Sequence, residues 1–279
     1  MSETRNDAGN GAGPGGGSAR KPRHLPWLTY LLLGPLIVIA TIVFGTMAMI
    51  ASLFDGHGGV QHRLAQAWAS TLLRFSLSPA EVVGPGTLKR NGPAVYAANH
   101  LSYMDPPLLF SKLPFQFRIV ARSGLWKIPF IGWYLHRSGQ IPVDSTSLRS
   151  SIASMNEGAK ALKSGMPLVI FPEGGRSADA TLQPFMNGPA YMAVKAGVPI
   201  VPMAIIGTHE LLPMHGNHLR PFPLRLAVGE EIDTSGYATR NLDPLTAKLY
   251  AAIQDLQTRF ADRDGNENGV EEGRMQHAE

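Results

Sequence analysis

The feature that most limits how this chain can fold is an apolar run from Leu25 to Phe54 that contains no Asp, Glu, Lys or Arg. About 20 apolar residues are enough for a helix to cross a bilayer. The apolar stretch of a cleavable signal peptide is shorter, about 7–15 residues. The run therefore predicts a helix that enters a membrane and is not removed as a signal peptide.

Two further features indicate how this helix continues. Gly34-Pro35 interrupts the apolar run, and residues 60–77 form a second, amphipathic helical pattern. We therefore expect residues 25–78 to form a membrane-embedded helical pair, re-entrant or monotopic. The apolar positions of the second helix recur at helical spacing: Leu64, Trp68, Leu72 and Phe75.

The length and composition of the chain allow one good-sized core beside the membrane-facing piece. The chain has 279 residues, of which 44% are hydrophobic and 16% are charged. We expect this core in residues 79–261. Residues 1–24 and 262–279 are polar and rich in small residues, so we expect both tails to be disordered.

Charge and cysteine content exclude several function classes. The net charge is +4, and carboxylates interrupt the positive residues, which favours a membrane surface or a phosphorylated substrate over nucleic acid. The absence of cysteine excludes disulfides, thiolate zinc sites and a cysteine nucleophile. Walker, dinucleotide-binding and Gly-x-Ser-x-Gly motifs are also missing from the sequence.

His209, His215 and His218 lack the spacing of metal ligands, and Pro213 opposes a helix there, so we expect no metal site.

After Pro79 short apolar runs alternate with helical patterns, which predicts an α/β fold with a mixed sheet flanked by helices. One helix should begin after Thr146 or Ser147 and stop at Gly165, and another should begin at Asp243-Pro244. The predicted strands are Ala94–Ala98, Arg118–Ala121, Ile141–Val143, Leu168–Phe171, Ile200–Ile206 and Leu224–Val228.

The first candidate for chemistry is the block Asn-His-Leu-Ser-Tyr-Met-Asp, which contains His100 and Asp105 and follows a predicted strand. Binding and catalytic sites of open α/β sheets form where strands end. An Asp five residues after a His can fold back, accept one ring N–H and leave the other nitrogen free as a base. Taken alone, the pair also fits a surface or capping histidine.

The second candidate is Phe-Pro-Glu-Gly-Gly-Arg-Ser, residues 171–177, which follows another apolar strand. Gly174 and Gly175 allow backbone N–H groups to approach an anion, and Arg176 offers a bidentate clamp for phosphate. Taken alone, the segment also fits a strand-to-loop turn in which Glu173 forms a local ion pair with Arg176.

Together the two blocks resemble the glycerolipid acyltransferase family related to bacterial 1-acylglycerol-3-phosphate acyltransferase. That family shows Asn-His-x-Ser-x-x-Asp, Gly-x-Ile, Phe-Pro-Glu-Gly-x-Arg-Ser and Val-Pro-Ile-Val-Pro blocks in this order. Here they stand at 99–105, 139–144, 171–177 and 198–202, and the resemblance covers about residues 80–230.

The resemblance implies direct transfer of a fatty acyl chain without a cofactor. His100, oriented by Asp105, would deprotonate a lysolipid hydroxyl, which attacks the thioester of acyl-CoA or acyl carrier protein. The default acceptor is 1-acylglycerol-3-phosphate, which gives phosphatidic acid. The residues expected to bind substrate are Arg122, Glu173, Gly174, Gly175 and Arg176.

The chain departs from the family pattern at two places. Gly175 stands where the family often has Thr, and Asp144-Ser145 stands where an Arg commonly helps to hold the acceptor phosphate. The second departure leaves Arg122 and Arg176 as the candidates for phosphate binding. It also keeps a phosphate-free acceptor, such as a lyso-ornithine lipid, as an alternative.

The expected location is the cell inner membrane, with the catalytic domain facing the cytoplasm. The positive-inside rule places Arg20, Lys21 and Arg23 in the cytoplasm, and a single crossing would then put the catalytic domain outside, away from a cytosolic thioester. A helical pair that returns the chain removes this conflict. The alternatives from other classes are a non-catalytic membrane lipid-binding protein and a lipid thioesterase in which His100 activates water.

Overall fold

The computed structural model describes residues 26–86, 88, 92–128, 131–144, 147–177 and 180–261. Within it the stretch Pro22–Ala261 forms one compact unit. The expected tails, 1–24 and 262–279, lie outside the described residues, and so does Ser145.

The apolar run forms one continuous helix, which is α1 (Pro26–Leu28), a π-helical turn (Thr29–Leu33) and α2 (Gly34–Ala51). By length and composition this helix could cross a membrane. The predicted interruption at Gly34-Pro35 is wrong, because the helix absorbs the proline with a π turn. Pro35 has no N–H to donate, and the Gly34 N–H bonds the Thr29 carbonyl five residues back.

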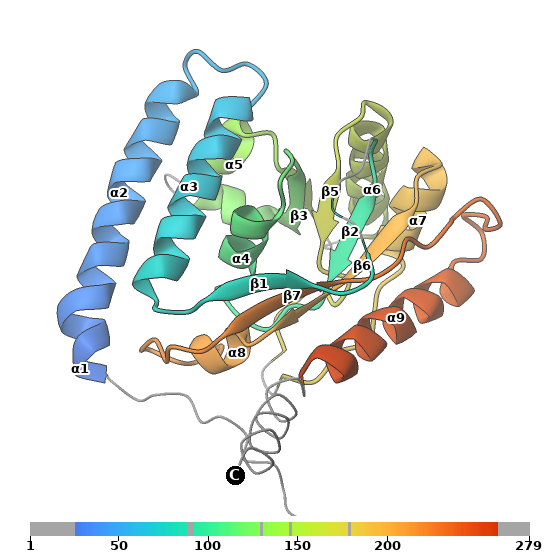
Figure 1. Ribbon diagram of the computed structural model, residues 1–279. Helices are drawn as coiled ribbons and strands as arrows, with labels where there is room; N and C mark the ends of the chain where they lie inside the picture. Colours follow the sequence, from blue (N-terminus) through green and yellow to red (C-terminus); the bar gives the residue numbers. More distant parts are fainter. Residues whose placement is uncertain are drawn as a thin grey trace, which may run out of the picture. The chain divides into compact units, whose positions relative to one another are not determined.

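The predicted amphipathic helix is confirmed as α3 (Gly59–Phe75), which lies beside α2 in Figure 1. Its buried side chains include Leu72 and Leu73, which join a core cluster beneath the helix. Residues 26–75 therefore form a helical pair, whose second member packs on the α/β domain.

The α/β domain is built on a seven-stranded sheet with the order β1-β7-β6-β2-β5-β3-β4. Neighbours pair in parallel except β6 and β7, which are antiparallel, so the sheet is mixed and mostly parallel. The strands are β1 (Ala80–Val83), β2 (Val95–Ala98), β3 (Arg118–Arg122), β4 (Ile141–Val143), β5 (Leu168–Ile170), β6 (Ile200–Ile206) and β7 (Leu224–Val228).

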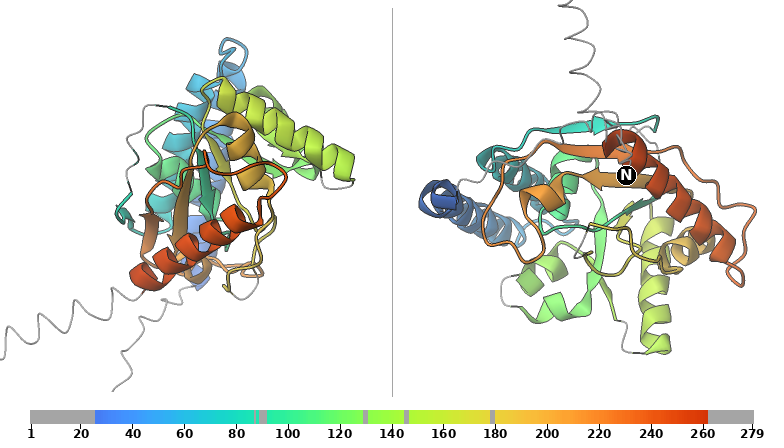
Figure 2. Two further views of the ribbon diagram at one scale, coloured as in Figure 1. Left: turned by 90° about the vertical axis from the view of Figure 1, so that its right-hand side faces the viewer. Right: turned by 90° about the horizontal axis from the view of Figure 1, so that it is seen from below.

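Helices cover both faces of the sheet. The remaining helices are α4 (Asp105–Lys112), a 3₁₀ helix (Ser123–Lys127), α5 (Ile131–Arg137), α6 (Leu148–Lys163), α7 (Gly188–Ala196), α8 (Thr208–Leu211) and α9 (Asp243–Ala261). Helices α6, α7 and α9 lie on the side away from α3 and α4, as Figures 1 and 2 show. Alternate residues of one strand therefore enter different clusters: Tyr96 of β2 packs with α3 and α4, and Ala97 packs with α6, α7 and α9.

The six predicted strands are confirmed within one residue at each end, and strand β1 and helix α7 are among the elements that were not predicted. Strand β1 lies at the edge of the sheet and is half exposed, so it lacks the apolar run that marks the buried strands. Helix α7 begins with Gly188-Pro189, a pair that reads as a turn in the sequence. Ser147 caps α6 through a capping box, as expected for a helix start there.

Candidate active site

The two candidate blocks meet at the carboxyl edge of the sheet. Strands β2 and β5 are parallel neighbours, so the loops that follow them leave the sheet side by side. The Ser177 N–H donates to the His100 carbonyl at 2.9 Å and ties the second loop to the first. The sheet topology therefore brings together residues that stand more than 70 positions apart in the sequence.

His100 and Asp105 form the contact that their spacing predicts. The imidazole Nδ1 lies 2.7 Å from Oδ2 of Asp105, whose side chain is completely buried. The same oxygen accepts the backbone N–H groups of Leu101 and Ser102 at 2.6 and 2.9 Å. An ionised carboxylate accepts all three donors, which assigns the proton to Nδ1 and leaves Nε2 as the basic nitrogen.

A second contact fixes the plane of the imidazole ring. The ring of Phe171 stacks on it with centroids 4.0 Å apart and an angle of 15° between the planes. The His100 side chain keeps 16% of its surface exposed. The ring is thus held by Asp105 at one edge and by Phe171 on one face, and it is still accessible.

Glu173 binds the backbone of the loop of residues 99–104, which carries His100. One carboxylate oxygen accepts the His100 N–H at 2.7 Å, and the other accepts the Gln183 N–H at 2.9 Å. Burial raises the pKa of the Glu173 carboxyl, and the two N–H donors act in the opposite direction. The described contacts of this side chain are therefore with the protein, and they join the loop after β2 to the loop between β5 and α7.

Two residues of the first block act on the backbone in a way that their types alone did not reveal. The Asn99 side chain accepts the Ile205 N–H at 2.7 Å and donates to the Ile205 carbonyl at 3.0 Å. The Ser102 hydroxyl donates to the Leu212 carbonyl at 2.6 Å. Both residues therefore tie the loop that carries His100 to β6 and the segment after it.

Two arginines border the same loops. Arg122, the last residue of β3, donates to the Gly174 carbonyl at 3.2 Å. The guanidinium of Arg176 lies 3.6 Å above the centre of the Tyr103 ring, which is itself 55% exposed. Stacking on a ring face leaves the in-plane N–H groups of a guanidinium free for an anion.

The two glycines of the second block lie beside Arg122, and only Gly174 has a backbone conformation that favours glycine. Gly174 has a φ of +68°, in the left-handed region that favours glycine. A Cβ at Gly175 would lie 3.7 Å from the nearest guanidinium nitrogen of Arg122, an ordinary contact. The expected binding residues Arg122, Gly174 and Gly175 are thus brought together at one point.

His209, His215 and His218 follow β6 and do not form a cluster of metal ligands. His209 falls within the short helix α8, which ends before Pro213. Among the described residues, no group of three or more His, Asp or Glu side chains could hold a metal ion.

Residues 79–206 match the protein-family model described as Acyltransferase. A 1-acyl-sn-glycerol-3-phosphate acyltransferase of Chlamydomonas reinhardtii is 30% identical over 220 residues, 77% of this chain and 64% of that protein. A protein of the same name from Saccharomyces cerevisiae is 32% identical over 197 residues, 67% of this chain and 64% of its own length. A chloroplastic one of Brassica napus is 30% identical over 185 residues, 66% of this chain but 53% of that protein. The chain thus spans about half to two thirds of the length of these curated relatives.

A solved structure shares the fold. The 1-acyl-sn-glycerophosphate (LPA) acyltransferase PlsC from Thermotoga maritima superposes with a TM-score of 0.69 at 22% sequence identity. The match covers 84% of this chain and 97% of that one.

Proposed function

This chain is a relative of the glycerolipid acyltransferases through residues 79–206, and we propose that it is a membrane-bound O-acyltransferase acting on a lysolipid. The observation that carries the proposal is the 2.7 Å contact between His100 Nδ1 and Asp105 Oδ2, with the imidazole still accessible. A buried carboxylate that fixes the tautomer of an accessible histidine is the arrangement of a general base.

The mechanism follows from that geometry. Nε2 of His100 takes the proton of the acceptor hydroxyl while its oxygen attacks the thioester carbonyl. The carbon–sulfur bond then breaks, and the imidazolium returns the proton to the leaving thiolate. Asp105 stabilises the positive charge on the ring between these two steps. The donor is acyl-CoA or acyl carrier protein, and the base contributes about 10²–10⁴-fold to the rate.

We assign 1-acylglycerol-3-phosphate as the acceptor and phosphatidic acid as the product. The support is a pair of arginines beside residues 99–104, which we call the catalytic loop. The guanidinium of Arg122 donates to the Gly174 carbonyl, and that of Arg176 lies over the Tyr103 ring. Guanidinium groups are suited to bidentate phosphate binding. The relatives are named for the same acceptor.

We assign Glu173 a positioning role in this reaction. Its carboxylate holds the backbone of His100 from behind and the Gln183 backbone on the other side. The substrate would then meet the arginines and the imidazole, while Glu173 keeps the loop that carries the imidazole in place.

The acceptor and product are membrane lipids, so we also propose that residues 25–78 associate with the inner membrane and that the catalytic domain faces the cytoplasm. The helix 26–51 exposes a wide apolar surface that no described residue covers. Strongly exposed members of this surface are Leu31, Ile39, Ile42, Val43 and Ile50, and Phe54 is exposed in the turn that follows the helix.

The direct test is acyl transfer by the full chain in phospholipid vesicles, with labelled acyl-CoA and 1-oleoylglycerol-3-phosphate. The product should be phosphatidic acid, and His100→Ala should lower kcat about 10²–10⁴-fold. If His100→Ala keeps the wild-type rate of acyl transfer, His100 is not the general base. Thioester loss at the same rate without an acceptor would identify a thioesterase, and absence of both reactions would identify a lipid-binding protein.

One observation favours a second acceptor. Ser145, after Asp144, stands where the family commonly places a phosphate-binding Arg, and loss of that Arg removes a contact that only a phosphate-bearing headgroup would use. A lyso-ornithine lipid in the same assay tests this candidate. Faster transfer to it than to the phosphorylated acceptor would overturn the acceptor assigned above.

A further inference from the structure

The π turn at Thr29–Leu33 depends on the two residues that follow it. Pro35 cannot donate a hydrogen bond, and the Gly34 N–H reaches back to the Thr29 carbonyl. A Cβ added to Gly34 would lie 2.8 Å from that carbonyl oxygen, closer than Cβ atoms approach backbone oxygens in proteins. The turn therefore requires glycine at position 34.

The π turn determines which side chains of this otherwise exposed helix face the α/β domain. Thr29 is buried, and its hydroxyl donates to the Leu219 carbonyl at 3.2 Å. Leu33 is buried in the same core cluster as Leu211 and Leu219. Since an α-helix turns about 100° per residue, loss of the extra residue of the π turn would rotate Thr29 away from this contact.

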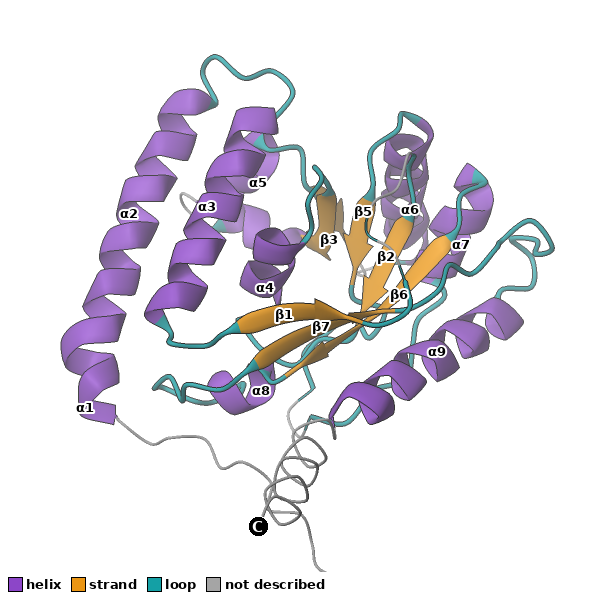
Figure 3. Cartoon of the chain, in the orientation of Figure 1, coloured by secondary structure: helices purple, strands orange, loops and turns teal. Residues whose placement is uncertain are grey.

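The segment that receives the π turn also contacts the catalytic loop. Figure 3 shows the loop after α8 extending toward α1. The Arg220 N–H donates to the Leu211 carbonyl at 2.9 Å and closes this segment into a compact loop. The Leu212 carbonyl, in the same segment, accepts the Ser102 hydroxyl at 2.6 Å.

Ser102 completes the connection to the candidate dyad. Its backbone N–H donates to Oδ2 of Asp105 at 2.9 Å, and the same oxygen lies 2.7 Å from the imidazole of His100. A continuous series of hydrogen bonds and packing contacts therefore runs from Thr29 through residues 211–220 to the catalytic histidine.

We propose that Thr29 and Leu33 are positioning residues of the active site. Docking of the π turn on Leu219 fixes segment 211–220, and the Leu212 carbonyl of that segment holds Ser102 and hence the carboxylate of Asp105. Small displacements of catalytic groups lower rates because the reacting atoms lose their alignment. The N-terminal helix is then a part of the catalytic machinery as well as an apolar surface, an inference that rests on the proposed acyl transfer.

The first experiment compares Gly34→Ala with Gly45→Ala in the full chain. Gly45 lies in the same helix and has nothing within 4 Å of an added Cβ, so it controls for the glycine substitution itself. Hydrogen exchange followed by mass spectrometry should show faster exchange at residues 207–222 and 100–105 in Gly34→Ala and no change in Gly45→Ala. Unchanged exchange in both segments, or faster exchange throughout the sheet, would overturn the proposal.

The second experiment separates positioning from substrate binding. Thr29→Val removes the hydroxyl at constant shape and should lower kcat about 3–30-fold, a size typical of coupling between distant residues, with KM for both substrates unchanged. Thr29→Ser keeps the hydroxyl and should restore kcat. A rise in KM at constant kcat, or no rescue by serine, would contradict the positioning role.

A double-mutant cycle tests the route through Ser102. The loss from Thr29→Val should be much smaller in a Ser102→Ala background, because the contact that transmits it is already absent. Full additivity would overturn this route. If the wild-type chain transfers no acyl group, the proposed function fails, and the hydrogen-exchange comparison still decides whether the π turn holds the loop.

Discussion

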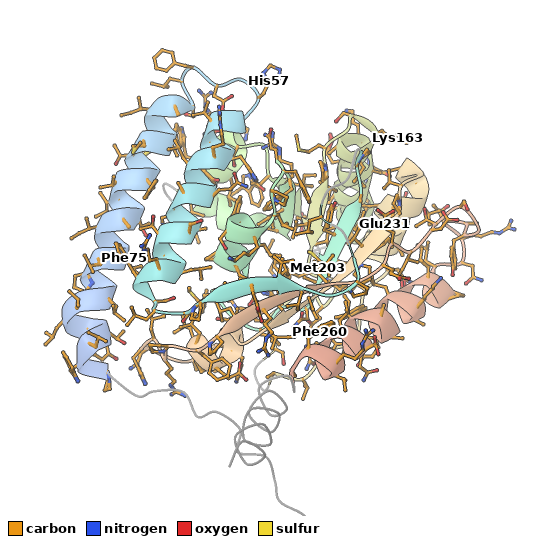
Figure 4. The ribbon with its side chains drawn as sticks, in the orientation of Figure 1. His57, Phe75, Lys163, Met203, Glu231 and Phe260 are labelled. Carbon is orange, nitrogen blue, oxygen red and sulfur yellow. The ribbon has the colours of Figure 1, made fainter. Side chains whose placement is uncertain are left out.

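Strand β3 carries an arginine at each end, and the two have opposite environments. Arg118 lies at the amino edge of the sheet, where its guanidinium donates to the carbonyls of Ser138 and His57. Figure 4 shows His57 in the loop that joins α2 and α3. Arg122, four residues later at the carboxyl edge, is exposed and donates to the Gly174 carbonyl.

The contacts of each arginine therefore depend on which edge of the sheet it occupies. At the amino edge the donors of Arg118 hold the helical pair on the domain. Gln116 and Arg137 do the same, donating to the carbonyls of His57 and Ser52 at 3.0 and 2.7 Å. At the carboxyl edge Arg122 has one described bond, to the Gly174 carbonyl, and we propose that its other donors bind the substrate. We therefore expect substitutions at the amino edge to change stability and those at the carboxyl edge to change catalysis.

Glu173→Gln should give the largest effect of the substitutions compared at the two edges. It tests whether the carboxyl edge also contains a residue that positions the catalytic loop without binding substrate. In Glu173→Gln one oxygen is replaced by a donor, so one of the two backbone N–H groups loses its acceptor. A hydrogen bond to a charged group contributes about 1.5–3 kcal/mol, so kcat should fall about 10–100-fold with KM for the acceptor unchanged. Steady-state kinetics measures both constants.

The protonation of Glu173 adds a second test, the dependence of stability and kcat on pH. Because burial raises its pKa, the native state binds a proton more readily than the unfolded state, so this group makes the wild type relatively more stable as pH falls toward its ordinary pKa. Activity should fall over the same window, since protonation removes an acceptor from the catalytic loop. As pH falls, the wild type should therefore gain stability to urea relative to Glu173→Gln, while the ratio of its kcat to that of the variant falls. A rise of both quantities would refute the positioning role.

Arg118→Met should give the next largest effect, and on stability alone. The substitution keeps much of the side chain but leaves the Ser138 and His57 carbonyls without this donor, which costs about 1–3 kcal/mol for partly buried groups. Thermal unfolding should show a lower Tm, while kcat and KM measured well below that temperature stay unchanged. A rise in KM for the acceptor would contradict the claim that the amino edge affects stability alone.

Much of this arrangement could be predicted from the sequence, for physical reasons that particular residues show. Strands β2 and β5 are short apolar runs buried on both faces, so both their positions and the loops after them were evident. The contact of His100 with Asp105 followed from a spacing of five residues. Local pattern was sufficient for these elements and for this contact.

The unpredicted contacts depend on tertiary structure. The carboxylate of Glu173 meets Gln183 and His100, and Thr29 meets Leu219 across 190 positions, so no local pattern encodes either contact. Arg122 was already predicted to bind substrate, but the contacts of Arg118 with Ser138 and His57 at the other end of β3 were not predicted. Gly34-Pro35 was read as an interruption because proline breaks a regular α-helix, and a π turn is the less common solution.

Arg122→Met should give the smallest effect. It is the same substitution as Arg118→Met, made at the carboxyl end of β3, so the two variants compare the two edges directly. Removal of one charge-assisted contact to a phosphate should raise KM for 1-acylglycerol-3-phosphate about tenfold, with kcat within about twofold. Tm should stay close to the wild-type value, since Arg122 is exposed and its described bond is to a single carbonyl. KM for a lyso-ornithine acceptor should not change, because that headgroup offers no phosphate. If Arg122→Met instead lowers Tm as much as Arg118→Met does, both ends of β3 serve stability, and Arg176 alone is left to bind the phosphate.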